Sequence, residues 1–218
     1  MALSLFAHPF SSYCQKVLVA LYENATPFTY RSFADDPAAW AECQERWPFG
    51  RFPVLSDDGR TIAESSIIIE HLDLHHRGPV RLLPEDPAAA LEVRFLDRFF
   101  DNHVQTPMQA PVFEKLRRDA ARAELVLEES RAALDRAYAW LDRWMEGRAW
   151  ASGEGPTLAD CAAAPALFYA DWIQPIGERF PQVKAYRARL LARPSMARAV
   201  EEARPFRPLF PLGAPDRD

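Results

Sequence analysis

The chain has 218 residues, of which 49% are hydrophobic and 26% charged, with a formal net charge of −5. This composition is ordinary for a folded protein of one or two domains and excludes a disordered chain, which would be less apolar and more highly charged. It also provides no basic surface for nucleic acid, and no apolar run reaches the roughly 18 residues that span a bilayer, so we expect neither partner.

The three cysteines, Cys14, Cys43 and Cys161, are far apart in the sequence and form no CxxC pair. We therefore expect no disulfide framework and no zinc site, and the pattern favours a reducing cytoplasm.

The first part of the chain, residues 1–77, alternates between strand and helix patterns. Leu3, Leu5 and Ala7 alternate as in a short strand, and residues 14–21 have apolar side chains with helical spacing. Asp58-Gly59 between two apolar runs predicts a hairpin. The further elements expected here are a strand at 28–33, a helix at 36–46, the hairpin at 52–63 and a helix at 65–75. This order is the thioredoxin arrangement, and His75, His76 and Arg77 are expected to form an exposed helix end.

Glycine and proline interrupt the pattern at 78–87, which we interpret as a linker, and residues 88–218 contain no strand pattern. The expected helices are a long one from 91 that bends near Pro107, one over 127–145 closed by Gly147, one that begins at Thr157, and one or two over 181–203. The predicted fold class is therefore α+β, with a thioredoxin-like N-terminal domain followed by an all-α C-terminal helical bundle.

The start of the first helix reads Ser11-Ser12-Tyr13-Cys14, with serine where thioredoxin-like proteins have an attacking thiol. Serine forms no disulfide, but Ser11 at a helix N-terminus suits the thiolate of a bound small molecule, because the helix dipole favours negative charge there. The alternative is that Ser11 or Ser12 only caps the helix. Cys14 lies on the apolar face of this helix, and we expect it to be an inert core residue.

Two further places favour a peptide-like ligand. A cis bond at Phe52-Pro53 would turn the Phe52 backbone outward, where an extended peptide could pair with it. Ser65, with the free amides of its helix, suits a carboxylate, and Glu64 suits an ammonium group. Together they suit an α-amino acid head group, although Ser65 could equally be a plain N-cap.

Nearly the whole chain resembles the bacterial cytosolic glutathione transferases of the serine type, which include theta-, zeta- and tau-like proteins. The resemblance is carried by the segments 11–17, 50–55, 64–72 and 157–160 in their order and spacing. It implies a cytoplasmic homodimer without a metal, with glutathione held in residues 1–77 and a small hydrophobic electrophile held against the helical domain, residues 88–218.

The resemblance also implies roles for individual residues. Ser11 is the expected catalytic residue, because it activates the glutathione thiol, and the wider set that holds glutathione is Ser11, Arg51, Phe52, Pro53 with a cis bond, Glu64 and Ser65. The expected electrophile pocket consists of Phe10, Met108, Val112 and Phe113, with Phe206 or Phe210 as a lid. Ser12 competes with Ser11 for contact with the thiol, and Arg51 replaces the usual lysine near the glycyl carboxylate.

The function expected from the sequence is conjugation of glutathione to small electrophiles, as a glutathione S-transferase. The enzymatic alternatives are glutathione-dependent peroxidase, isomerase or dehalogenase activity, which use the same thiolate. Maleylacetoacetate isomerase is disfavoured because Tyr13 stands where the zeta-class signature has cysteine. The alternative from another class is a non-catalytic, stringent-starvation-like interaction protein.

Overall fold

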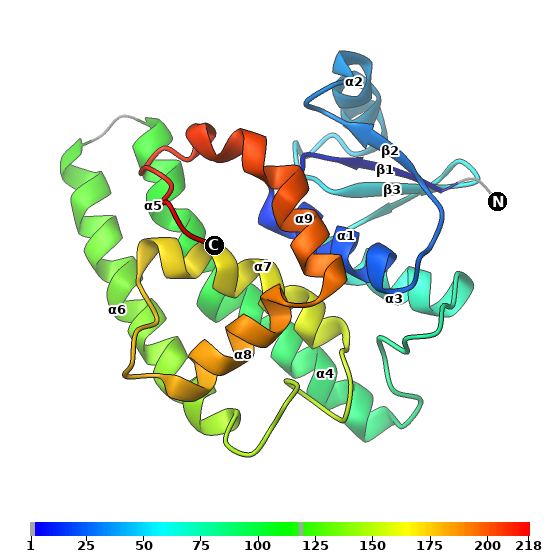
Figure 1. Cartoon of the computed structure of the whole chain (residues 1–218). Coiled ribbons are helices and arrows are strands. Elements are labelled where there is room, and N and C mark those ends of the chain that lie inside the picture. The colour runs from blue at the N-terminus through cyan, green and yellow to red at the C-terminus, as the bar shows by residue number, and fades with distance from the viewer. Residues whose placement is uncertain (1–2, 118–119) are drawn as a thin grey trace.

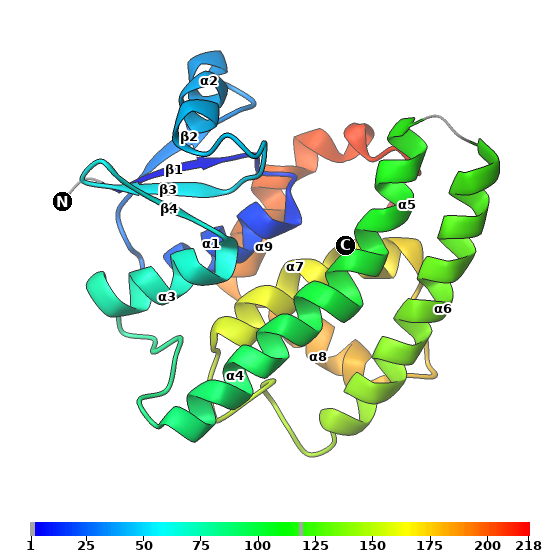
Figure 2. The same cartoon turned by 180° about the vertical axis from the view of Figure 1, so that it is seen from behind.

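A computed structural model describes residues 3–117 and 120–218; for residues 120 and 121 it describes the backbone alone. A four-stranded mixed sheet with helices on both faces is followed by a helical domain (Figures 1 and 2). The sheet domain contains β1 (Leu3–Ala7), α1 (Ser12–Glu23), β2 (Thr29–Ser32), α2 (Pro37–Arg46), β3 (Val54–Asp57), β4 (Arg60–Ala63) and α3 (Ser65–His75). The helical domain contains α4 (Pro87–Phe99), a π-helical segment (Phe100–Gln105), α5 (Thr106–Arg117), α6 (Ala120–Trp144), α7 (Leu158–Ile173), α8 (Pro181–Leu191), α9 (Pro194–Ala203) and a 3-10 turn (Arg204–Leu209).

The sheet has the strand order β2-β1-β3-β4, with β2 parallel to β1 and the other pairs antiparallel. Side chains of β1 alternate between two cores, as the period of a strand requires. Leu5 and Ala7 join the large core that includes α1, whereas Phe6 packs with Ala39 and Cys43 of α2. Helices α1 and α3 therefore cover one face of the sheet and α2 the other (Figure 1).

Helix α7 forms the centre of the helical domain and contacts α1, α4 and α8. All but one of its residues are buried, as expected for a helix that is apolar on every side. Contact with α1 joins the two domains through a continuous core, so residues from both of them meet around one site.

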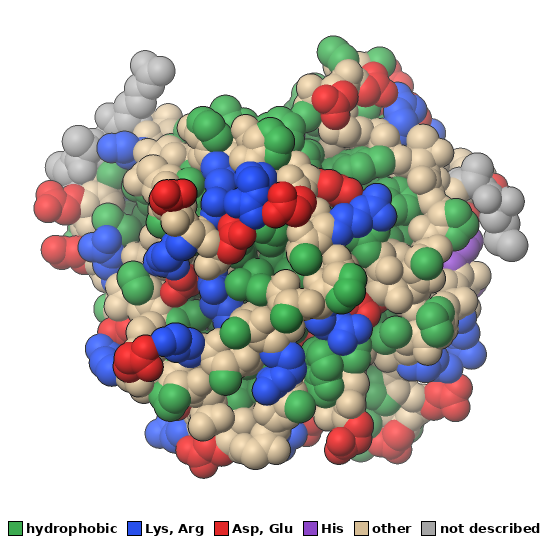
Figure 3. Space-filling view, in the orientation of Figure 1, with side chains coloured by type: hydrophobic (Ala, Val, Ile, Leu, Met, Phe, Trp, Pro, Cys, Tyr) green, Lys and Arg blue, Asp and Glu red, His purple; other side chains and the backbone are tan. Residues whose placement is uncertain are grey.

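Charged side chains of both signs are intermingled on the face seen in Figure 3, so this face carries no continuous basic surface. Among residues 3–117 and 120–218, every helix is too short or too polar to cross a membrane.

The structure confirms the predicted fold class, and the third helix begins and ends at the expected residues. The expected bend at Pro107 takes a different form, because the α-helix gives way to a π-helical turn just before the proline. The Thr106 N–H there reaches back five residues to the Asp101 carbonyl. Pro107 has no N–H to donate, so the change of helix type lies where the regular hydrogen-bond ladder is broken anyway.

Candidate functional site

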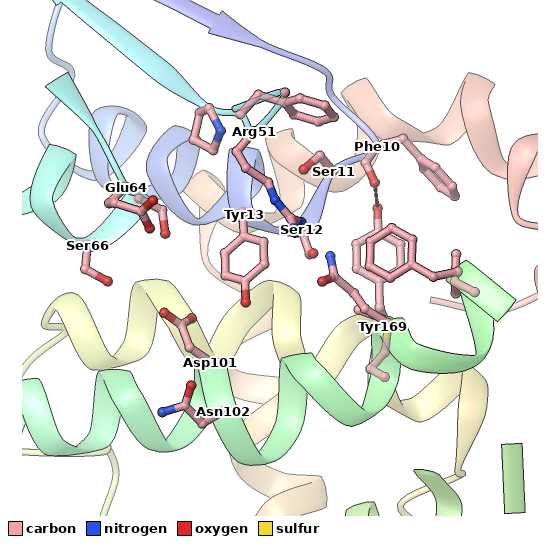
Figure 4. A pocket seen from close by; sticks show the side chains of 18 of the residues that line it. Phe10, Ser11, Ser12, Tyr13, Arg51, Glu64, Ser66, Asp101, Asn102 and Tyr169 are labelled. Carbon is pink, nitrogen blue, oxygen red and sulfur yellow. Dashed lines mark hydrogen bonds between the residues drawn. The ribbon is translucent and has the colours of Figure 1, made fainter. Parts of the chain in front are cut away.

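A cleft of about 860 Å³ lies between the two domains, and the N-termini of α1 and α3 both open into it (Figure 4). All ten residues expected to hold a ligand line this cleft, namely Phe10, Ser11, Arg51, Phe52, Pro53, Glu64, Ser65, Met108, Val112 and Phe113. Residues that are far apart in the sequence therefore share one site.

The loop that leads into α1 is held by its own hydrogen bonds. The Ser11 N–H donates to the His8 carbonyl at 3.0 Å, and the Phe10 N–H donates to His8 Nδ1 at 3.1 Å. Burial lowers the pKa of His8, which favours the neutral ring that this acceptor role needs. At the end of the loop, Ser11 Oγ caps the helix by accepting the Cys14 N–H at 3.4 Å.

The helical domain fixes the same loop from the other side. Tyr169 of α7 donates its hydroxyl to the Phe10 carbonyl at 3.1 Å, the contact drawn in Figure 4. Gln15 donates to both the Pro9 carbonyl and the Tyr169 hydroxyl, each at 3.0 Å. The position of Ser11 in the cleft is thus set by both domains.

The two adjacent serines have different surroundings. Ser12 is buried, and its hydroxyl accepts a hydrogen bond from the Gln105 amide in the π-helical segment. Ser11 is only partly buried, and its hydroxyl acts as an acceptor in the cap, so its proton remains available to a ligand. Cys14 is fully buried, and burial raises the pKa of its thiol to about 12, which makes it inert.

The start of α3 differs in one respect from expectation. Ser65 is the first helical residue rather than the N-cap, because Glu64 occupies the capping position with a φ of +69°. Such a backbone is unfavourable for a residue with a side chain, and strain of this kind concentrates at functional sites. It leaves the Glu64 carboxylate exposed at the cleft while Ser65 is buried beside the free helix amides.

Arg51 and Phe52 lie between these two helix starts. The Phe52-Pro53 bond is cis, as expected. The Phe52 ring packs edge-to-face against Phe33 and Trp40, and the side chain of Arg51 points into the cleft (Figure 4). Within the described residues Arg51 makes no ion pair, so its charge is available to an anionic ligand.

A buried ionic network forms the floor of the cleft, and the sequence reasoning missed it. The Lys16 ammonium, 1% exposed, lies 2.6 Å from Asp97 and 2.9 Å from Asp101, and it also donates to Ser66. Arg98 donates to both aspartates. Burial raises the pKa of the Asp101 carboxyl, and the network fixes α1 and α3 to the helical domain directly below the site.

The far end of the cleft is more apolar. Phe210 and Met108 both line it, whereas the alternative lid residue, Phe206, packs edge-to-face against His8, with 4.9 Å between the ring centroids, and does not line the cleft. Tyr13 projects from α1 with its hydroxyl toward Asp101 (Figure 4). Burial, and after it the negative charge of the Asp101 carboxylate, raises the pKa of Tyr13 to about 12. Tyr13 is therefore a neutral hydrogen-bond donor at the cleft, beside the ionic network of its floor.

Two protein families match most of the chain. The glutathione S-transferase N-terminal domain family matches residues 5–80, and the glutathione S-transferase C-terminal domain family matches residues 104–194. A glutathione S-transferase from Pseudomonas putida is 28% identical over 217 residues, which cover 95% of this chain and 96% of the relative.

Two further relatives are similar over most of their length. FtsZ-localized protein A from Caulobacter vibrioides is 29% identical over 203 residues, covering 88% of this chain and 87% of that protein. The crystal structure of a glutathione S-transferase from Methylobacillus flagellatus, with glutathione bound, superimposes with a TM-score of 0.79 at 26% identity, covering 91% of this chain and 98% of the other.

Proposed function

Because this chain belongs to the cytosolic glutathione transferase family, we propose that it is a glutathione S-transferase that activates the glutathione thiol and transfers it to small electrophiles. The proposal rests on one observation above all, namely that two helix N-termini open into the same interdomain cleft, with Ser11 only partly buried and Glu64 exposed at their capping positions. Arg51 lies beside them and makes no ion pair within the described residues. We also expect a cytoplasmic location, since the three cysteines are free and buried.

The charges of the cleft suit the three parts of glutathione. The α-carboxylate of the γ-glutamyl head is placed at the start of α3, against Ser65 and the free amides, with its ammonium group on Glu64. The Arg51 guanidinium takes the glycyl carboxylate. The Phe52 backbone pairs with the cysteinyl part of the extended peptide, which brings the thiol to Ser11 at the start of α1.

The reaction then requires no more than activation and proximity. The N-terminal end of α1 and the Ser11 hydroxyl both stabilise a negative sulfur, and they lower the thiol pKa from its ordinary value of about 8.5. The thiol releases its proton to water, and the thiolate forms a C–S bond with an electrophile held among the apolar residues of the pocket. The bond from that carbon to its leaving group breaks, as for the chloride of a chloronitrobenzene, and the leaving group departs to solvent. Holding both reactants supplies several kcal/mol of the barrier reduction. The pocket residues are Phe10, Met108, Val112 and Phe113. A peroxidase, isomerase or dehalogenase reaction would use this same thiolate.

The discriminating experiment compares the two serines. Ser11→Ala should raise the pKa of bound glutathione, followed through the ultraviolet absorption of the thiolate, and should lower kcat by about 10²-fold with a chloronitrobenzene acceptor. The dissociation constant of glutathione should change little, because Ser11 contacts only the sulfur. Ser12→Ala is the matched control. A thiol pKa that rises in Ser12→Ala alone would show that Ser12, and not Ser11, activates the thiol.

A second candidate function is a non-catalytic interaction protein, which the similarity to FtsZ-localized protein A favours. Such a protein has no need of a glutathione site. Calorimetric titration with glutathione separates the two candidates: saturable binding that is weakened by Arg51→Ala supports the enzyme, and absence of binding supports the interaction protein.

We further infer that the protein is a homodimer, because exposed apolar side chains gather on α3 and α4 beside the cleft.

A further inference from the structure

A second cluster of chemically capable side chains lies at the opposite end of α3 from the cleft. His71 Nε2 and His76 Nε2 lie 2.8 and 2.7 Å from the same atom, Oδ2 of Asp57. None of the three residues lines the cleft, and His71 is six residues beyond Ser65, about 9 Å along the helix. The expectation of an exposed helix end is wrong for His76, whose side chain is 11% exposed.

We propose that Asp57, His71 and His76 bind a divalent transition-metal ion of the Zn²⁺ type. One ligand atom from each residue lies within 4.8 Å of the other two. Two imidazole nitrogens and one carboxylate oxygen are a donor set that Zn²⁺ and its neighbours prefer, with water in the remaining position.

Side-chain rotation can bring the three donors around an ion, because the two histidine nitrogens already lie within 4.8 Å of each other. Ligand atoms of a tetrahedral zinc with bonds of about 2.0–2.1 Å lie roughly 3.3 Å apart, so the present separations of 2.7 and 2.8 Å open by about half an ångström. The residues stand at the last residue of β3 and at the end of α3, where side-chain rotation disturbs no central element. The side chains are 10–14% exposed, which leaves a path for the ion and for water.

Such an ion would hold the β3–β4 hairpin against α3. Both elements also carry cleft residues at their other ends, since Pro53 precedes β3 and Ser65 begins α3. The site is therefore structural rather than catalytic, and its occupancy should raise the midpoint of thermal unfolding.

His75 provides the matched control. It lies one helical turn after His71, its ring centroid 4.6 Å away, and it is exposed. An exposed pair of histidines at i and i+4 could chelate a metal without the hairpin. Variants of His75 and Asp57 therefore distinguish the proposed three-residue site from a simple helix pair.

The test uses the full chain without a polyhistidine tag, stripped of metal with a chelator and titrated with Co²⁺ and Zn²⁺. We expect one equivalent of Co²⁺ to give the visible absorption of a low-coordinate site, and one equivalent of Zn²⁺ to displace it. Asp57→Asn and His76→Gln should each weaken binding at least about tenfold, the lower bound for losing even an outer-shell group, whereas His75→Gln should leave it unchanged.

Two results would overturn the proposal. One is absence of saturable binding to the wild-type chain. The other is binding that survives Asp57→Asn and His76→Gln but is lost in His75→Gln. Asp57→Asn keeps a carbonyl acceptor for the histidines, and circular dichroism of each metal-free variant shows whether it is folded. Should Asp57→Asn fail to fold, His76→Gln alone decides between the two outcomes.

Discussion

His8 shows how a single half-buried side chain makes the entrance to the site sensitive to pH. Its Nδ1 accepts the Phe10 N–H only while the ring is unprotonated there, and burial keeps its pKa below the ordinary value of 6.5. The unfolded chain therefore binds a proton at His8 before the folded chain does. The stability that this difference provides is complete above about pH 6.5 and is lost as the pH falls toward the folded pKa.

The comparison is between the wild-type chain and His8→Gln, which retains an acceptor but does not titrate. Between pH 7.5 and pH 5.5 the free energy of unfolding, measured with urea, should fall further for the wild type than for the variant. Equal losses in both chains would show that His8 contributes nothing to the pH dependence.

Individual site residues differed in how well the sequence predicted them. The positions of Ser11, Glu64 and Ser65 at the cleft could be predicted because each stands at a helix start, where the local sequence pattern is clear. Their roles toward a ligand stay predictions. Lys16 and Tyr169 were missed because their partners are distant: Lys16 binds Asp101 across 85 positions, and Tyr169 binds Gln15 across 154. Lysine within an apolar helical pattern was a signal for Lys16, since a buried ammonium needs carboxylate partners.

At the level of elements, α7 depends on the carboxylate of Asp160. This group is 2% exposed and accepts hydrogen bonds from the Thr157 N–H at 2.8 Å, the Ala151 N–H at 3.0 Å and the Tyr186 hydroxyl at 2.6 Å. It therefore joins the start of α7 to the preceding loop and to α8, in addition to holding the Thr157 N–H at the start of the helix.

Removal of this carboxylate should cost more than removal of the cap alone. Thr157→Ala loses a cap, worth about 0.5–2 kcal/mol, whereas Asp160→Ala also leaves two or more buried donors without partners, at about 1–3 kcal/mol each. Chemical denaturation gives both costs, and the thiol pKa of bound glutathione should be the same in both variants. Equal costs would mean that the bonds to Ala151 and Tyr186 contribute nothing.

The π-helical segment is the element that the sequence predicted least well. Periodicity indicated a continuous helix with a bend at Pro107, and it could not show an extra residue in one turn, because a single insertion changes the phase of the pattern by only a fraction of a turn. Its effect is nevertheless large, since the segment brings Asp101 to Lys16 and Gln105 to Ser12.

On the scale of the whole molecule, the two-domain architecture could be predicted because strand and helix periods separate cleanly at the Gly-Pro break. The sequence contains no comparable pattern for a dimer interface. The candidate surface becomes visible only when the structure shows which apolar side chains are exposed together. Four large apolar side chains are 51–67% exposed on α3 and α4, namely Ile67, Leu74, Leu91 and Phe95. The spacing i to i+7 on α3 and i to i+4 on α4 places each pair on one helix face.

Between these pairs, Glu70 and Arg94 join the two helices through a bidentate ion pair at 2.8 and 2.9 Å. We define the four apolar residues and this ion pair as the α3–α4 surface. An apolar core interrupted by a satisfied polar pair is typical of a protein–protein interface, and a second copy of the chain covers it in our proposal.

Leu91→Arg should therefore convert a dimer into a monomer, because a twofold interface places the new charge in the buried contact twice. Sedimentation velocity at micromolar concentration should give the wild type twice the mass of one chain and the variant the mass of one. Leu125→Arg on α6, where the leucine is 56% exposed, is the control and should remain dimeric. A monomeric wild type, or dissociation of both variants alike, would contradict an interface at the α3–α4 surface. Since Ile67 and Arg94 also line the cleft, loss of the dimer should additionally weaken glutathione binding.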